Sequence, residues 1–210
     1  MRFPLNSLCS AVSVPSRRPA RRKAGLKPGG DENSYFQIWQ EKGGEKNENL
    51  TLKNVIAVLP GKNPEFDAQS VVICAHYDHL GLGWPDVRKG NEGKIHFGAD
   101  DNASGVAGLL EIGRLLGQVQ LKTRVVLVAF ALEEPPFFRS NNMGSAVYAK
   151  SLSESGAEVK LMIALEMIGY FSNRPNSQTL PFGFNLLFPD AANMVSQDEF
   201  RGNFITNVGN

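Results

Sequence analysis

The sequence predicts an α/β protein, a three-layer α/β/α sandwich with a mixed, mainly parallel central sheet. Three observations lead to this prediction. Short apolar, β-branched runs alternate with segments of helical periodicity, turn-forming residues separate them, and an apolar content of 42% in 210 residues is enough to bury one core. In such a fold the helices cover the faces of the sheet, and functional groups lie at the ends of the strands.

The predicted elements follow one another in a regular order. Two strands over residues 54–61 and 70–78 are separated by a turn-rich link, and a helix over residues 103–117 repeats its leucines and isoleucine at helical spacing. Small polar residues before this helix can cap it. The remaining predictions are a buried strand at 123–134, a helix at 143–155, another buried strand at 159–169, and weaker strands at 185–188 and 202–210.

The N-terminal region differs from the rest in charge. Residues 1–30 hold seven of the 22 basic residues and none of the 21 acidic ones, so the remaining chain is acidic. We predict a basic, disordered leader over residues 1–49 and a folded domain over residues 50–210. The acidic body argues against nucleic acid as a partner. No apolar run has the length of a membrane span, and Pro4 with polar neighbours leaves no clear signal peptide.

Carboxylates and a histidine mark the ends of four predicted elements. They are His76 and Asp78, then Asp100 and Asp101, then Glu133 and Glu134, and finally Glu166. Each group by itself has an ordinary explanation as a strand end, a helix cap or a solvated loop. Together they converge on one edge of the sheet, and so many anions in one place are costly unless cations are present.

Metal binding explains both the residue types and their spacing. A strand places Asp78 on the same face as His76, where its carboxylate can hold the second ring nitrogen of a metal-binding histidine. Asp101 has two oxygens with which it can bridge two metal ions. Adjacent glutamates point to opposite faces of a regular strand, so the two prolines that follow Glu134 must break the strand for both to point inward.

The motifs "AHYDHLG", "GADDNASG", "ALEE" and "LEMIGY", in this order and spacing, resemble those of the co-catalytic di-zinc aminopeptidases, the bacterial leucyl-aminopeptidase type of zinc-dependent exopeptidase. The resemblance covers residues 52–210, and "GADDNASG" is its most specific part. It implies a zinc metallopeptidase that removes N-terminal residues from peptides with a free N-terminus.

The resemblance also implies a role for each polar residue. It assigns His76 and Glu166 to one zinc, Glu134 to the other, and Asp101 to both. Asp78 would orient His76, and Glu133 would be the general base that takes a proton from the zinc-bound water to give hydroxide. A cis peptide bond is expected between Asp101 and Asn102.

The sequence departs from the family pattern in three places. Glu166 stands where the family has Asp, and the link after Glu134 is longer, so the preferred N-terminal residue of the substrate cannot be transferred. The family takes its last zinc ligand, a histidine, from a later segment, and the chain ends at Asn210. We therefore expect a sandwich that is incomplete at the C-terminus, a fragment with reduced or no activity, and one tightly bound zinc. His79 and His96 are expected to be loop residues or outer partners of the metal ligands, with a ligand role as the alternative.

Two other functions share this fold. One is acyl transfer on a single zinc, as in glutaminyl cyclases, and the other is a non-catalytic scaffold that has lost its ligands. The pairing of Glu133 with Glu134 favours hydrolysis, because a scaffold has no need of an unliganded base. The resemblance favours an extracytoplasmic location, and the oligomeric state is not readable from the sequence.

Overall fold

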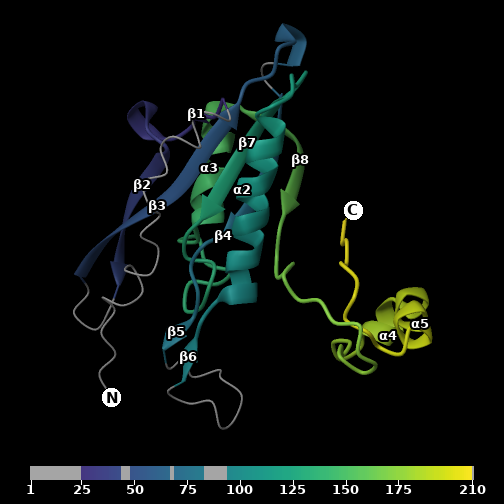
Figure 1. Cartoon of the computed structure of the whole chain (residues 1–210). Helices are drawn as coiled ribbons and strands as arrows, with labels where there is room; N and C mark the ends of the chain where they lie inside the picture. The colour runs from purple at the N-terminus through teal and green to yellow at the C-terminus, as the bar shows by residue number, and fades with distance from the viewer. Residues whose placement is uncertain (1–24, 44–47, 67–68, 83–93, 210) are drawn as a thin grey trace. The chain divides into compact units, whose positions relative to one another are not determined.

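The structure of the chain, a computed structural model, describes residues 25–43, 48–66, 69–82 and 94–209. It divides into two compact units, Met1–Met167 and Ile168–Asn210. The first unit holds the sheet and all of the predicted site residues (Figure 1). The first 24 residues of the predicted leader lie outside the described residues.

The central sheet has six strands among the described residues. They run in the order β1, β3, β7, β4, β8, with β2 also paired to β3. Their bounds are Lys27–Pro28 (β1), Phe36–Gly43 (β2), Glu48–Leu59 (β3), Gln69–His76 (β4), Arg124–Phe130 (β7) and Glu158–Ala164 (β8). The sheet begins upstream of the predicted domain boundary near residue 50, because β1 and β2 both pair with β3.

The predicted mixed sheet is confirmed, but its described strands are not mainly parallel. β4 is parallel to β7 and β8, whereas β3 is antiparallel to β1, β2 and β7. The apolar patterns of β3 and β7 reveal that both are buried strands, but not the relative directions in which they run. The parallel part of the sheet is the part that carries the candidate site, because β4 ends at His76.

Two helices cover opposite faces of the sheet and confirm the three-layer arrangement (Figure 1). Tyr148 of α3 (Gly144–Ser155) packs in one apolar cluster, and Leu109 of α2 (Gly105–Leu116) packs in the other. Val128 of β7 is 0% exposed between its neighbours. The valine- and isoleucine-rich strands are thus buried on both sides, which fixes the central strands in place.

The prediction that β8 is buried is wrong. Every residue of β8 is exposed, and Leu161 retains 52% of its accessible surface. β8 is the last strand in the sheet order, with β4 as its paired neighbour, and none of its residues belongs to either apolar cluster. Its apolar sequence therefore does not reflect burial by the described part of the chain.

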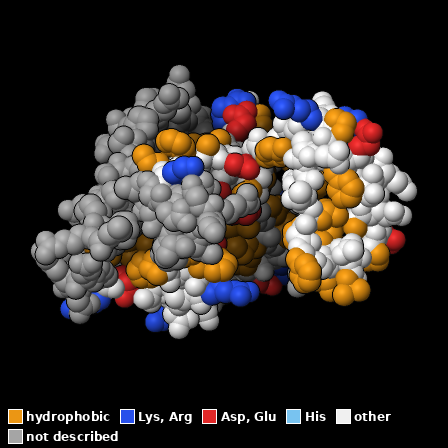
Figure 2. Space-filling model, turned by 90° about the horizontal axis from the view of Figure 1, so that it is seen from below, with side chains coloured by type: hydrophobic (Ala, Val, Ile, Leu, Met, Phe, Trp, Pro, Cys, Tyr) orange, Lys and Arg blue, Asp and Glu red, His pale blue; other side chains and the backbone are white. Residues whose placement is uncertain are grey.

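The second unit contains two short helices, α4 (Phe184–Leu187) and α5 (Pro189–Gln197). The predicted strand at 185–188 is wrong, since these residues are mostly helical, and the predicted strand at 202–210 is reduced to a single bridge at Gly202. Hydrophobic side chains are exposed over these helices (Figure 2). Within the described ranges, no helix is both long and apolar enough to cross a membrane.

A buried asparagine joins β3 to the loop that carries Glu133 and Glu134. Asn54 is 0% exposed. Its Oδ1 accepts a hydrogen bond from the Ala131 N–H (3.1 Å), and its Nδ2 donates to the Gly144 carbonyl (2.8 Å) and to Gln37 Oε1 (2.8 Å). A Cβ atom at Gly144 would overlap Asn54 Oδ1, so this close approach requires glycine. Asn54 therefore holds both ends of the loop between β7 and α3.

We expect Asn54→Ala to lower the free energy of unfolding by at least about 2 kcal/mol, since each buried polar group left without a partner costs about 1–3 kcal/mol. Denaturant unfolding of the two proteins measures the change. Gln37→Ala is the matched control, because it removes one hydrogen bond to Asn54 and leaves both backbone contacts. Equal losses in the two variants would contradict this account.

Candidate metal centre

His76 is the centre of the candidate site. It is the last residue of β4 and is 4% exposed. Its Nε2 atom faces three carboxylates, at 3.1 Å from Asp101 Oδ1, 3.3 Å from Glu166 Oε1 and 3.9 Å from Glu133 Oε2. These groups arrive from separate segments, and they meet because each follows a strand or precedes a helix at the same edge of the sheet.

Asp78 holds the other side of His76. The Nδ1 atom of His76 lies 3.1 Å from the Asp78 carbonyl oxygen and 3.5 Å from its carboxylate. The same carboxylate accepts hydrogen bonds from the backbone N–H groups of Glu133 (3.1 Å) and Glu134 (3.0 Å). The two backbone contacts are not apparent from the sequence, because they join positions more than fifty residues apart. Asp78 thus fixes the histidine and the glutamate pair to each other.

The glutamate pair lies on a turn directly after β7. Leu132 has a left-handed backbone (φ 58°), and the Pro135–Pro136 peptide bond is cis. A break in the strand is therefore present, but it lies after Phe130, before the glutamate pair, and not after Glu134 as predicted. It places Glu133 Oε2 3.9 Å from His76 Nε2. It also brings a carboxylate oxygen of Glu134 within 4.8 Å of one of Asp101.

Asn102 organises the opposite wall of the site. It is 1% exposed, and its Nδ2 donates to the Leu165 carbonyl (2.9 Å) and to Glu166 Oε2 (3.1 Å). Its Oδ1 accepts from the N–H groups of Gly105 (3.1 Å) and Met167 (3.2 Å). The sequence pattern predicts this asparagine only as part of a helix cap. Its uncharged amide within an acidic motif is the signal that could have indicated a buried role.

The loop that contains Asp101 is an irregular helical turn, Ala99–Ser104, before α2. The Asp101–Asn102 peptide bond is cis, as predicted. Glu166 lies two residues beyond the end of β8, and its side chain is half-exposed. Its flanking apolar residues indicate partial burial with a polar partner, and the structure agrees, because Glu166 contacts His76 and Asn102.

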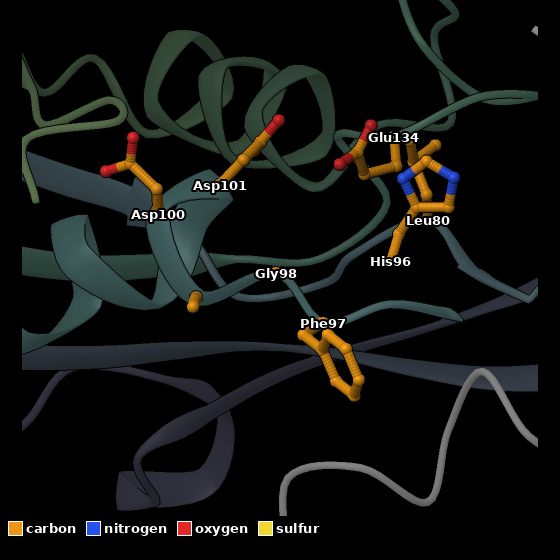
Figure 3. A pocket seen from close by; sticks show the side chains of 8 residues that line it. Leu80, His96, Phe97, Gly98, Asp100, Asp101 and Glu134 are labelled. Atoms are coloured by element: carbon orange, nitrogen blue, oxygen red, sulfur yellow. The ribbon is translucent and has the colours of Figure 1, made fainter. Parts of the chain in front are cut away.

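Three side chains form a compact set of donors. Ligand atoms of His76, Asp101 and Glu134 all lie within 4.8 Å of one another. Asp101 and Glu134 point toward each other in the pocket, whereas Asp100 turns away (Figure 3). One imidazole nitrogen and two carboxylates suit a divalent metal ion, zinc among them. The other predicted residues, Glu133, Glu166 and Asp78, surround this set.

The remaining histidines are placed differently from His76. His79 Nδ1 accepts from the Gly81 N–H (3.1 Å) and lies 2.9 Å from the His96 carbonyl oxygen. His96 ends β6 (Ile95–His96), which pairs with β5 (Gly81–Leu82), and its side chain lines the pocket with Asp101 and Glu134. His96 thus ends a short strand instead of lying in a loop, and its place beside Asp101 and Glu134 fits its alternative prediction as an outer partner of the ligands.

The crowding of negative charge shifts the pKa values of the site. Burial and the charges of Asp101 and Glu133 raise the pKa of Glu134 to about 7. Burial and neighbouring carboxylates also raise the pKa of Glu133 and Glu166. Burial opposes the charged form of His76, but its hydrogen bond with Asp78 and the nearby carboxylates outweigh this and raise its pKa to about 9. The site favours a positive charge at its centre, which a proton or a metal ion can supply.

An α/β sandwich that gathers imidazole and carboxylate donors at the carboxyl end of its central strands is typical of metal-dependent hydrolases. Comparison with known proteins narrows this class. The sequence model of Peptidase family M28 matches residues 54–200, and the chain belongs to this family. The resemblance inferred from the four motifs is thereby confirmed.

Curated relatives match part of their length. The uncharacterized protein YfbL of Escherichia coli (strain K12) is 50% identical over 144 residues, which are 68% of this chain and 39% of YfbL. Leucine aminopeptidase 1 of Phaeosphaeria nodorum is 32% identical over 122 residues, which are 56% of this chain and 28% of that protein. The chain thus spans less than half the length of these relatives.

Solved structures share the fold. A Zn-dependent exopeptidase from Parabacteroides distasonis gives a TM-score of 0.52 at 20% identity, with 91% of this chain and 65% of that chain covered. A glutaminyl cyclase from Porphyromonas gingivalis gives 0.55 at 21% identity, with 90% and 64% covered. These likenesses establish the architecture and not the reaction.

We expect Zn²⁺ binding to the metal-free protein at pH 7 to release about one proton from His76 and a fraction of one from Glu134, because both must be deprotonated to act as ligands. The apparent affinity should therefore rise as the pH approaches 9. Calorimetric titrations in two buffers of different ionisation enthalpy measure the released protons. Identical heats in both buffers would contradict the expected protonation of His76.

Proposed function

We propose that this chain carries the catalytic centre of a zinc-dependent metallopeptidase, and that the reaction is the removal of N-terminal residues from peptides. The observation that carries the proposal is the position of Glu133. Its carboxylate lies 3.9 Å from His76 Nε2, outside the compact set of donors and next to it. A carboxylate beside a metal site, but not in it, suits a general base.

The distances support a division of the ligands between two zinc ions. Asp101 Oδ1 lies 3.1 Å from His76 Nε2, and Glu166 Oε1 lies 3.3 Å from it, so one ion could contact all three side chains. Glu134 lines the pocket beside Asp101, and ligand atoms of both lie within 4.8 Å of one of His76. Three protein ligands are the usual number for a catalytic zinc, so we propose that the position at His76 binds tightly and the position at Glu134 more weakly.

Each residue of the chain has a defined task in the proposed hydrolysis. Zinc, when bound, lowers the pKa of water toward neutrality and polarises a carbonyl group. Glu133 takes the proton of the attacking water and returns it to the leaving amine. The Asp78 carboxylate accepts a hydrogen bond from the backbone N–H of Glu133 and so holds this residue in place. The Asp78 carbonyl oxygen lies next to His76 Nδ1 and holds the imidazole ring. The acidic groups that remain suit the protonated α-amine of a peptide substrate.

Cyclisation of N-terminal glutamine by one zinc is the alternative reaction. The glutaminyl cyclase fold neighbours support it only as an architecture, at 21% identity. The leucine aminopeptidase relative supports hydrolysis through its sequence, at 32% identity. A non-catalytic scaffold is disfavoured because the Asp78 carboxylate accepts hydrogen bonds from the backbone N–H groups of Glu133 and Glu134. These two bonds hold both glutamates at the site.

Counting zinc and assaying two substrates tests the proposal. We expect close to one tightly bound zinc per chain and slow release of nitroaniline from aminoacyl-nitroanilides. Chelation should abolish this activity, and zinc should restore it. Cyclisation of a glutaminyl peptide without nitroaniline release would favour the cyclase reaction, and a protein that binds no zinc would overturn the proposal.

Glu133→Gln should retain zinc and lose most turnover, because an amide cannot relay a proton. General acid–base assistance is typically worth about 10²–10⁴-fold in rate. The variant is best made in a form of the protein with full aminopeptidase activity, with zinc content and nitroaniline release measured together. Wild-type turnover in this variant would exclude Glu133 as the base.

Glu134→Gln is expected to behave in the opposite way. It removes a proposed ligand, so zinc affinity should fall, and excess zinc should recover part of the activity. Zinc titrations of both glutamate variants separate the two roles. If both variants lost zinc equally, the division between base and ligand would be wrong.

A further inference from the structure

Asn102 contacts three consecutive residues in the segment that carries Glu166. Its Nδ2 donates to the Leu165 carbonyl oxygen (2.9 Å) and to Glu166 Oε2 (3.1 Å), and its Oδ1 accepts from the Met167 N–H (3.2 Å). Oδ1 also accepts from the Gly105 N–H (3.1 Å), at the start of α2. A primary amide has two donor hydrogens and two acceptor positions, so the hydrogen-bonding capacity of Asn102 is fully used.

These contacts fix the backbone on both sides of Glu166. Met167 has a left-handed backbone (φ 46°), which residues with a side chain rarely adopt unless their surroundings impose it. A Cβ atom at Gly105 would lie 2.4 Å from Asn102 Oδ1 and 2.5 Å from the Leu165 carbonyl oxygen, so the close approach of α2 requires glycine. The position of the Glu166 backbone is therefore set by Asn102, although the Glu166 side chain is 51% exposed.

The two carboxylate oxygens of Glu166 face different partners. Oε2 accepts from Asn102, whereas Oε1 lies 3.3 Å from His76 Nε2, the atom that Asp101 also approaches. The donor is shielded from water, because Asn102 is only 1% exposed. Carboxylates that bind a metal are commonly held by such an outer hydrogen bond. Glu166 thus has one oxygen engaged with the amide and the other directed toward the proposed zinc position at His76.

We propose that Asn102 is a positioning residue that holds Glu166 Oε2, so that Glu166 binds zinc through Oε1 alone. The inference rests on the proposed zinc position at His76 and adds a residue that does not itself touch the ion. It also accounts for the presence of glutamate where the family has aspartate. The additional methylene group lets one carboxylate reach Asn102 and His76 at the same time.

Exchanging the amide and the carboxylate between the two residues tests the proposal. Asn102→Asp keeps the shape of the side chain and removes its donor, and Glu166→Gln leaves one oxygen, which Asn102 should hold away from zinc. We expect each variant to weaken the tightly bound zinc by at least about tenfold, because losing an outer partner of a ligand costs about 10–100-fold in affinity. For Asn102→Asp the direction is informative, since added negative charge alone would strengthen the binding of a cation.

The double variant, Asn102→Asp with Glu166→Gln, has the net charge of wild type and the same hydrogen bond in the reverse direction. The introduced glutamine donates to the introduced aspartate and turns its carbonyl oxygen toward zinc. We expect the double variant to bind zinc at least about tenfold more tightly than Glu166→Gln alone, a coupling that a double-mutant cycle reveals. Competition with a chromophoric chelator, on the metal-free, full 210-residue chain, measures each affinity.

Ser70→Ala is the matched control for the loss of a buried hydrogen bond. Ser70 is 1% exposed, and its Oγ donates to the Glu158 carbonyl oxygen (3.3 Å) near the start of β4, whereas His76 ends that strand. The control should unfold at lower denaturant concentration than wild type and keep the zinc affinity of wild type. A general loss of stability is thereby separated from the positioning of Glu166.

The outcomes distinguish this inference from the function on which it rests. An unchanged zinc affinity in Asn102→Asp, or additive losses in the double variant, would overturn the role of Asn102 and leave the zinc position at His76 intact. Should Asn102→Asp fail to fold, Glu166→Asp decides the question. Its shorter side chain cannot reach both partners, so zinc should bind at least about tenfold more weakly, and an unchanged affinity overturns the inference. A wild-type chain that binds no zinc would instead overturn the proposed function.

Discussion

The geometry of the candidate site depends on the carboxylate of Asp78. This one group lies against Nδ1 of His76 and accepts the backbone N–H groups of both Glu133 and Glu134. It joins the end of β4 to the turn after β7, two neighbouring parallel strands. Hydrogen bonds to a charged acceptor are stronger than neutral ones, so the link is well suited to hold the two segments in register. Without it, the histidine and the glutamate pair would be related only through the ladder between β4 and β7 and the Tyr77–Phe130 backbone hydrogen bond.

Two buried asparagines extend this framework to the rest of the site. Asn54 holds both ends of the loop that carries the glutamates, and Asn102 holds the Asp101 turn against the segment that carries Glu166. An asparagine can do this inside an acidic site because it offers donors and acceptors without adding charge. The side-chain amides therefore hold the clustered carboxylates in place without adding charge to the site. A proton on His76 or a bound metal ion can supply the positive charge that these carboxylates favour.

The sequence predicts the local parts of this arrangement and misses the parts that depend on distant partners. His76 with Asp78, the acidic turn at Asp101 and both sheet-covering helices follow from spacing and periodicity over a few residues. The clamp formed by Asn102 could not be predicted, because its partner Leu165 is 63 positions away. The burial of β8 was mispredicted for a related reason. An apolar strand reveals its preference for burial, but whether it is covered depends on elements elsewhere in the fold.

The two halves of the candidate site differ in how firmly their donors are held. The donors around His76 come from the end of a central strand and from turns that Asp78 and Asn102 fix by partly buried hydrogen bonds. On the other side, Glu134 is fixed through its backbone N–H at the turn after β7. Donors on rigid, well-supported elements bind a metal with less reorganisation than donors that must turn into place. The central strand β4 thus supports His76 directly, whereas Glu134 depends on the turn after β7, a difference that fits the unequal zinc affinities we propose.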